Sequence, residues 1–210
     1  NAAIAKMNLF LHGASDFNVM QGDTLRDPKI LQGGNIAKFD CVIANPPFSL
    51  ENWGATEWSS DKYKRNIYGT PSDSCGDYAW IQHMICSMSS GKGRMAVVMP
   101  QGILFRGNQE AEIRKQLVES DLIEAVVTLG DKLFYGTGLS PCFLIIRRMK
   151  PAHHSGRILM IDGSKILTQK RAQNILEEND IDRLYSLYQN YSDEEDYSRI
   201  VTLQEIRDKE

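Results

Sequence analysis

The chain has 210 residues, of which 42% are hydrophobic and 24% charged, and its formal net charge is −3. This length and composition predict one folded core with attachments and exclude a chain that stays disordered, while the acidic balance argues against a free-standing nucleic-acid binder held by counterion release. Because no apolar run approaches the roughly 18 residues that span a bilayer and residues 1–6 show no signal-peptide pattern, we expect a cytoplasmic protein without membrane contact.

Short apolar runs and helical spacings alternate along the chain. The runs predict strands at residues 17–20, 39–44, 94–99, 122–129 and 141–146. Between the second and third runs, apolar residues recur at helical spacing after Asp77, which we expect to cap that helix. Asn108 opens a second predicted helix between the third and fourth runs.

This alternation indicates the fold class. Strands that are apolar on both faces and alternate with helices are typical of a doubly wound α/β domain with a mainly parallel sheet. About ten residues separate the last two strands, too few for a standard crossover, so we expect an antiparallel hairpin at one edge. Ligands of such sheets bind at the carboxyl ends of strands, which places Asp23, Asn45 and Pro100 at the expected site.

The pattern changes after residue 150. Residues 157–161 predict another strand, and apolar spacings further on predict helices. So short a segment buries little apolar surface alone. We therefore divide the chain into a domain of residues 1–150 and an extension of residues 151–210, helical in part, that packs on it.

The most informative motif is Asn45-Pro46-Pro47-Phe48, directly after the second predicted strand. An amino group conjugated to a purine ring is a poor nucleophile because its lone pair is delocalised. The Asn45 side-chain oxygen and the Pro46 carbonyl offer two fixed acceptors for the N–H groups of such a nitrogen. Consecutive prolines stiffen the turn and remove backbone donors, and Phe48 offers a face on which a base can stack.

Two simpler interpretations stand beside these. The motif alone is also consistent with a strand end whose Phe48 belongs to the core, because short motifs recur by chance. Asp23, which follows Gly22, is also a common turn former.

Several further motifs occur in an order that resembles one family. They are MNLFLHG at residues 7–13, GDTL at 22–25, NPPFS at 45–49, GDYAWIQHM at 76–84, PQGILFR at 100–106 and LFYGTG at 133–138. Together they resemble the amino-methylating DNA methyltransferases, specifically the methylation subunit of type I restriction-modification systems. Such an ordered set is more specific than any single motif.

The resemblance implies the S-adenosylmethionine-dependent methyltransferase fold and N6-adenine methylation of a flipped base in double-stranded DNA. By position, it implies catalytic roles for Asn45, Pro46, Pro47 and Phe48, and cofactor binding by Asp23, Thr24, Leu25 and Asn45. No metal is implied. A specificity subunit and a restriction endonuclease subunit are the implied partners.

The resemblance also implies that residues 1–150 are a partial catalytic domain, truncated at its N-terminus. The family's glycine-rich cofactor loop is expected upstream of Asn1. We therefore expect this chain alone to bind S-adenosylmethionine weakly or not at all and to be inactive.

Two loops are less decisive. Phe134 or Tyr135 is a candidate for the second wall of a base pocket, or else a hydrophobic anchor of the hairpin. Residues 49–75 combine aromatic and basic side chains, which suits either nucleic-acid contact or a solvated loop.

Two other functions remain open from the sequence. The first is methylation of a protein glutamine, because the same motif suits any planar nitrogen. The second is a non-catalytic assembly module that keeps the fold without cofactor binding.

Overall fold

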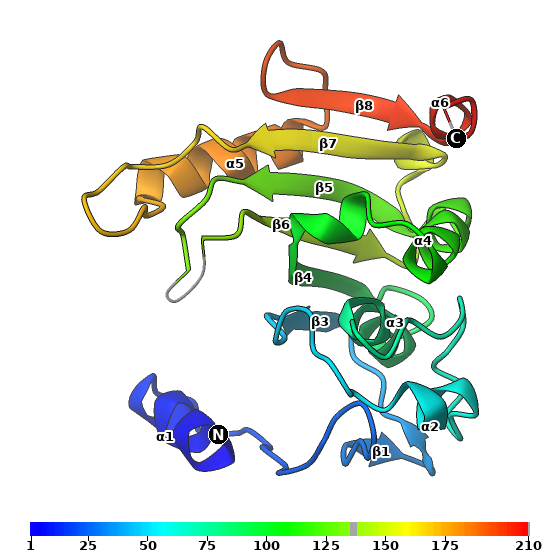
Figure 1. Cartoon of the computed structure of the whole chain (residues 1–210). Helices are drawn as coiled ribbons and strands as arrows, with labels where there is room; N and C mark the ends of the chain where they lie inside the picture. The colour runs from blue at the N-terminus through cyan, green and yellow to red at the C-terminus, as the bar shows by residue number, and fades with distance from the viewer. Residues whose placement is uncertain (135–137, 210) are drawn as a thin grey trace.

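A six-stranded β-sheet in the order β3-β4-β6-β5-β7-β8 forms the centre of the molecule (Figure 1). The computed structural model describes residues 1–134 and 138–209. The strands of this sheet are β3 (Cys41–Ala44), β4 (Arg94–Pro100), β5 (Ile123–Leu129), β6 (Pro141–Arg147), β7 (Arg157–Gly163) and β8 (Ser198–Thr202). A separate ribbon pairs β1 (Leu31–Gln32) with β2 (Asn35–Ile36).

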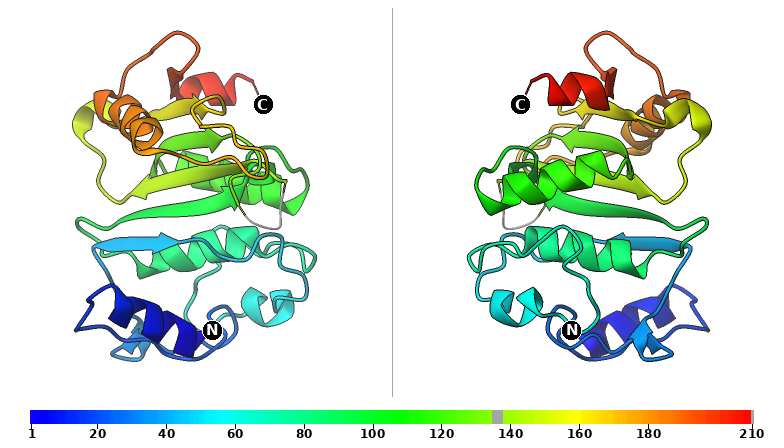
Figure 2. Two further views of the ribbon diagram at one scale, coloured as in Figure 1. Left: turned by 90° about the vertical axis from the view of Figure 1, so that its left-hand side faces the viewer. Right: turned by 90° about the vertical axis from the view of Figure 1, so that its right-hand side faces the viewer.

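Helices cover both faces of the sheet. Apolar residues of α3 (Asp77–Ser87) and α4 (Gln109–Glu119) pack on one face, and those of α5 (Glu178–Asn190) pack on the other (Figure 2). The remaining helical segments are α1 (Ala2–Leu11), α2 (Ala55–Ser59), α6 (Leu203–Arg207) and the 3-10 turns η1 (Gln101–Leu104) and η2 (Ala152–His154). The predicted doubly wound α/β class is confirmed.

The directions of the strands refine that prediction. Strands β3, β4, β5 and β7 run in one direction, and β6 and β8 run in the opposite one. The sheet is therefore mixed rather than mainly parallel. The antiparallel β5–β6 hairpin is present, but its predicted place at an edge is wrong: β6 inserts between β4 and β5, and the free side of β5 pairs with β7.

Four of the five predicted strands form close to their expected positions, as β3, β4, β6 and β5. The first one does not form: residues 17–20 have no strand structure, and Met20 is 53% exposed. A strand needs a neighbour for its backbone hydrogen bonds. Among the described residues no strand lies beside this segment, which explains the failure of the prediction.

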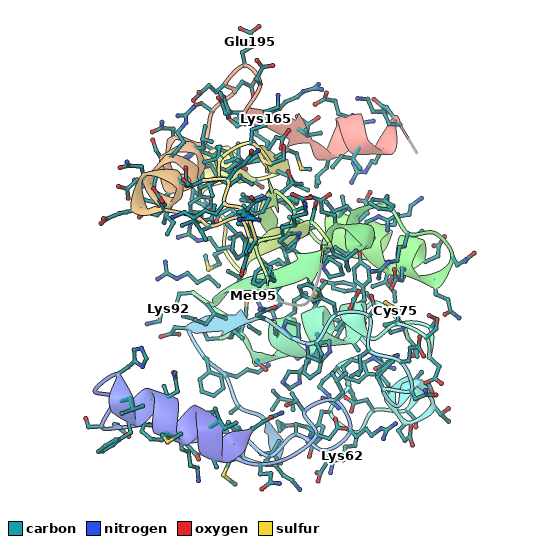
Figure 3. The ribbon with its side chains drawn as sticks, turned by 60° about the vertical axis from the view of Figure 1, so that its left-hand side comes forward. Lys62, Cys75, Lys92, Met95, Lys165 and Glu195 are labelled. Atoms are coloured by element: carbon teal, nitrogen blue, oxygen red, sulfur yellow. The ribbon has the colours of Figure 1, made fainter. Side chains whose placement is uncertain are left out.

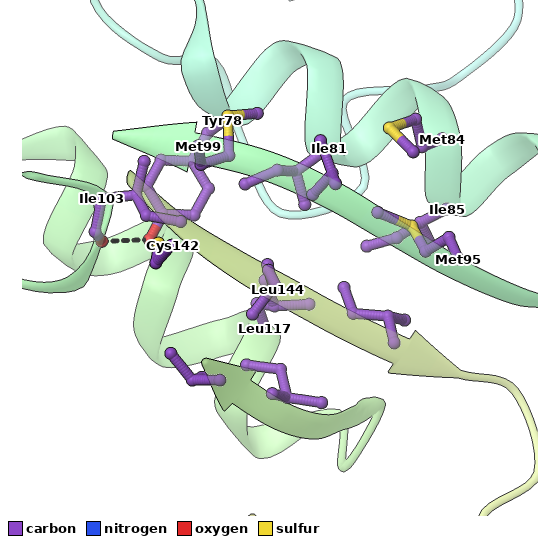
Figure 4. Packing of buried hydrophobic residues seen from close by; sticks show 14 of the residues in the cluster. Tyr78, Ile81, Met84, Ile85, Met95, Met99, Ile103, Leu117, Cys142 and Leu144 are labelled. Atoms are coloured by element: carbon purple, nitrogen blue, oxygen red, sulfur yellow. Dashed lines mark hydrogen bonds between the residues drawn. The ribbon is translucent and has the colours of Figure 1, made fainter. Parts of the chain in front are cut away.

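The core lies between the sheet and α3. The side chains of Ile81 and Ile85 on α3 meet those of Met95 and Met99 on β4, and all are fully buried (Figure 4). This burial of alternate strand residues and of one helix face drives the assembly of the domain. It also fixes the N-terminus of α3 at the end of the sheet where the predicted site lies.

The first helix lies apart from this core. None of the residues of α1 is buried, and Phe10 and Leu11 are both exposed. Figure 3 shows this helix set apart from the sheet. In the described part of the chain no helix is long and apolar enough to cross a membrane.

Residues after 150 continue the central sheet. Strand β7 pairs with β5 in parallel, and β8 pairs with β7 in the antiparallel direction. Leu187 of α5 is buried against Leu159 and Ile161 of β7. The extension thus shares the sheet of the preceding residues.

Candidate active site

The strands β3, β4, β5 and β7 run in the same direction, so the loops that follow them lie at the same end of the sheet (Figure 1). The predicted catalytic motif is the loop after β3. In it, Asn45 and Pro47 are exposed, Pro46 is buried and Phe48 is half-buried. No described residue donates a hydrogen bond to the Asn45 side chain or to the carbonyl oxygen of Pro46. Both acceptors are therefore unused within the described part of the chain.

A second aromatic ring lies beside Phe48. The centroids of the Phe48 and Phe134 rings are 6.5 Å apart, with planes at 79° to each other. Phe134 belongs to the loop after β5, so this contact joins two loops at the carboxyl end of the sheet. Edge-to-face pairs of this kind orient both rings. The other candidate, Tyr135, lies outside the described residues.

A buried carboxylate holds the end of the catalytic loop. Asp77, whose side chain is fully buried, does not cap α3 as predicted: Gly76 is the cap residue and Asp77 is the first helical residue. Its Oδ1 accepts a hydrogen bond of 2.7 Å from the backbone N–H of Ser49, and its Oδ2 accepts one of 2.7 Å from Nη1 of Arg106. We call these three residues the Asp77 clamp.

Other groups complete the surroundings of Arg106. Its Nη1 also lies 3.3 Å from both carboxylate oxygens of Glu110 and donates to Sγ of Cys75 at 2.9 Å. Burial raises the pKa of the Cys75 thiol to about 12, so this thiol stays protonated at neutral pH. Glu110 thus pairs with Arg106, four residues earlier in the chain. In the described part of the chain it forms no ion pair with Arg114, four residues later on α4.

A pocket of about 320 Å³ opens next to the catalytic loop, between β3, α3 and residues 20–39. Thr24, one of the predicted cofactor residues, lines it together with Ala44, the residue before Asn45. Trp80 and His83 line it from α3. Its volume and mostly apolar wall are in the range of small-molecule sites.

The other predicted cofactor residues lie close to this pocket. Asp23 is exposed and forms a turn: its Oδ1 accepts hydrogen bonds from the backbone N–H groups of Leu25 and Arg26, both at 3.0 Å. No described residue bonds to its Oδ2. The side chain of Leu25 is buried against Trp53 and Trp58, so it is a core residue of this turn.

Arg65 supports the same turn through hydrogen bonds to its backbone. It is 1% exposed, and its guanidinium donates to the carbonyl oxygens of Thr24 at 2.9 Å and Leu25 at 2.6 Å. Asp61 neutralises it through contacts of 2.7 and 3.0 Å. Nη1 also lies 3.2 Å from Nδ1 of His83, so a neutral His83 accepts this bond and carries its proton on Nε2.

The pair of Arg65 and His83 predicts a pH dependence of stability. Burial, together with the charge of Arg65, lowers the pKa of His83 from 6.5 to about 4. Between these two values the unfolded chain binds a proton that the folded chain excludes, so stability falls as the pH drops. We expect His83 to remove about 2 kcal/mol of unfolding free energy between pH 7 and pH 4.5.

Urea unfolding of the wild type and of His83→Gln at these two pH values measures this effect. The variant should lose less stability than the wild type by about that amount. An equal loss in both proteins would show that His83 titrates normally in the folded state.

Residues 49–75 differ from both interpretations drawn from the sequence. Trp53, Trp58 and Arg65 are buried, and the Arg65 guanidinium lies 4.5 Å from the centroid of the Trp58 ring. Trp53 and Trp58 form a small core with Leu25. The segment is thus neither a solvated loop nor, through these residues, a nucleic-acid surface. Lys64 remains exposed, as does Lys62 (Figure 3).

Sequence reasoning missed the residues that support the site. Asp77 and Arg106 lie in two of the quoted motifs, yet nothing in their spacing indicates that they meet. Arg65 lies in residues 49–75, for which the sequence suggests nucleic-acid contact or a solvated loop rather than a buried support. A buried charge needs a partner, so a basic residue between aromatic ones was the available signal for Arg65.

Comparison with known proteins gives a consistent result. The sequence model of the family described as N-6 DNA Methylase matches residues 1–210. The methylase subunit of the type I restriction enzyme MjaVII of Methanocaldococcus jannaschii is 36% identical over 98% of this chain and 36% of its own length. The methylase subunit of the type I restriction enzyme HindI of Haemophilus influenzae is 29% identical over 99% of this chain and 47% of its own.

A solved structure is similar over nearly the whole chain. The methyltransferase subunit of a type I restriction-modification system from Streptococcus thermophilus superposes with a TM-score of 0.89 and 28% identity, covering 99% of this chain and 43% of that one. The chain thus spans less than half the length of these relatives.

Proposed function

Because this chain belongs to the N-6 DNA Methylase family, we propose that the protein containing it methylates N6 of adenine in DNA, as the methylation subunit of a type I restriction-modification system. One observation carries the assignment of the site. Asn45 stands exposed at the carboxyl end of β3, with its side chain and the Pro46 carbonyl unused by any described residue.

The chemistry of the site follows from these two acceptors. Hydrogen bonds from both N–H groups of the adenine amino group to Asn45 and Pro46 localise the nitrogen lone pair and aim it away from the ring. The prolines prevent the loop from relaxing. Phe48, held by Phe134, offers a flat apolar face to the base. Since a duplex hides the amino group, the adenine has to leave the base stack first.

The pocket beside the loop suits the adenosine part of S-adenosylmethionine. When bound, this cofactor supplies an electrophilic methyl group. Thr24 and Ala44 line the pocket, and the buried Nε1–H of Trp80, which also lines it, has no acceptor among the described residues. An unused donor of this kind fits a ligand with ring nitrogens or hydroxyl groups. Asp23, whose neighbours Gly22 and Thr24 line the pocket and whose Oδ2 has no partner among the described residues, is the proposed acceptor for the adenine amino group of the cofactor.

We also propose the partners that this function requires. Sequence recognition belongs to a specificity subunit and cleavage to a restriction endonuclease subunit, as in the type I systems to which the relatives above belong. The net charge of −3 agrees with this division, because tight DNA binding through phosphates alone needs a positive surface.

Label transfer tests the proposal. The intact methylation subunit and its specificity subunit are incubated with S-adenosylmethionine labelled in the methyl group, and with either duplex DNA or protein acceptors. We expect label on N6 of adenine in DNA. Label on a glutamine side chain would support the other transferase interpretation, and no transfer to either acceptor would support an assembly module. The comparisons favour neither of these two alternatives.

A further inference from the structure

An exposed aromatic ring, that of Phe105, stands next to the candidate active site. Phe105 is the residue after η1, the 3-10 turn that directly follows β4, and its side chain is 73% exposed. Exposed apolar residues are common on protein surfaces, so exposure alone says little. The position and the support of Phe105 distinguish it from the others.

The backbone on both sides of Phe105 is clamped. The carbonyl oxygen of Ile103, a buried residue, accepts a hydrogen bond of 2.7 Å from the buried hydroxyl of Tyr78 (Figure 4). Nη1 of Arg114 donates to the same oxygen at 3.2 Å and to the carbonyl oxygen of Arg106 at 2.8 Å. Two carbonyl groups that flank Phe105 are thus tied to α3 and α4. The ring is presented on a rigid tip rather than on a loose loop.

The same tip is joined to the catalytic loop. Arg106, the next residue, donates to Asp77 of the clamp and reaches Oγ of Ser49 at 3.4 Å. Ser49 follows Phe48 directly. Gly102 allows this close arrangement, because a Cβ there would come within 2.6 Å of the Arg106 guanidinium. The tip and the end of the Asn45–Phe48 loop are therefore joined by hydrogen bonds through Arg106, Asp77 and Ser49.

The surroundings of Phe105 suit a nucleic-acid base more than a protein partner. A protein interface needs a patch of several apolar side chains. Between residues 101 and 110, all of them described, Phe105 is the one exposed large apolar side chain. Exposed small or uncharged polar residues, Gly107, Asn108 and Gln109, follow it. A lone ring on a rigid support is the form in which proteins insert wedges between base steps.

We propose that Phe105 is such a wedge: it enters the DNA base stack beside the target adenine and stabilises the duplex from which this base has been extruded. The proposal rests on the proposed function and adds a base-stacking site outside the pocket of Asn45 and Phe48. Its ligand is a base step of the duplex next to the target.

The test uses the intact subunit with its specificity subunit and two duplexes. One has the target adenine paired with thymine, and the other has it opposite an abasic position. We expect Phe105→Ala to slow methylation about tenfold on the paired duplex and less than about twofold on the abasic one, because the wedge replaces lost stacking only where a pair must be broken. With 2-aminopurine at the target position, the fluorescence gain on binding should fall in the same variant.

Two controls separate the possible results. Phe105→Trp keeps a stacking ring and should restore the rate, and Tyr185→Ala, which removes an exposed aromatic ring on α5, should leave it unchanged. An unchanged rate in Phe105→Ala, or equal slowing on both duplexes, would overturn the wedge while the wild-type activity upholds the methyltransferase assignment. Absence of DNA methylation by the wild type would remove both.

Discussion

Replacement of Asn45 by alanine is expected to slow methyl transfer to adenine about a hundredfold or more, which is the effect of removing one preorganised hydrogen-bond partner of a reacting group. The Asn45 side chain is exposed, and no described residue bonds to it, so the protein itself loses no contact. The whole loss should therefore appear in turnover. Single-turnover methylation with saturating DNA and cofactor measures it.

The design of this experiment includes two further variants. Asn45→Asp keeps an acceptor oxygen at the same position and should retain more activity than the alanine variant. Asn35→Ala removes an exposed asparagine from β2 and should behave as the wild type. Thermal unfolding should be the same for all of them. Unchanged turnover in Asn45→Ala would rule out the proposed role of this residue in the reaction.

The second large effect is expected in the Asp77 clamp. Asp77→Ala leaves the Ser49 N–H without its acceptor and removes the buried partner of Arg106. Breaking a buried pair in this way should cost about 3 kcal/mol of unfolding free energy, because the Ser49 N–H loses its acceptor and Arg106 keeps only its longer contacts with Glu110. Asp77→Asn keeps an oxygen for the Ser49 N–H and should lose less. Urea unfolding curves of the intact subunit measure both.

Two comparisons make the result specific to the clamp. Asp73→Ala removes an exposed carboxylate from the preceding turn and should change stability little. In the double variant Asp77→Ala with Arg106→Met the two losses should be less than additive, because both single changes break the same contact between the two residues. Additive losses would mean that the two residues do not stabilise the protein as a pair.

Local features of the fold were predictable because they depend on neighbouring residues. The apolar runs that became β4, β5 and β6 carry enough β-branched and buried residues to form strands in this context. The helix over Asp77–Ser87 follows from the spacing of its apolar side chains. Residues 17–20 carry the same local signal and yet form no strand, because the signal says nothing about which strand lies beside them.

In the candidate site, too, features that depend on neighbouring residues were predictable, whereas contacts between distant residues were not. The motif directly after β3 predicts Asn45 and Phe48 as site residues, and the sequence offers Phe134 or Tyr135 as the second wall of a base pocket; of these two, Phe134 contacts the Phe48 ring. The sequence offered no means to see that Asp77 contacts Ser49, 28 residues away, or that Arg65 contacts the Gly22–Leu25 turn from 40 residues away. Such contacts form only when the chain folds, and no periodic pattern in the sequence indicates them.

The amino-acid sequence by itself determined the kinds of local element, the stiff loop of Asn45 to Phe48 and its place directly after an apolar strand. These properties depend on side-chain branching, proline geometry and apolar spacing within a few residues. Only the tertiary structure decided the order of the strands, the insertion of β6 beside β4, and the burial of Arg65 and Asp77 as supports of the site. Strand pairing and buried charge pairs gain their stability from groups distant along the chain. They therefore form only when the folded domain excludes water from these groups.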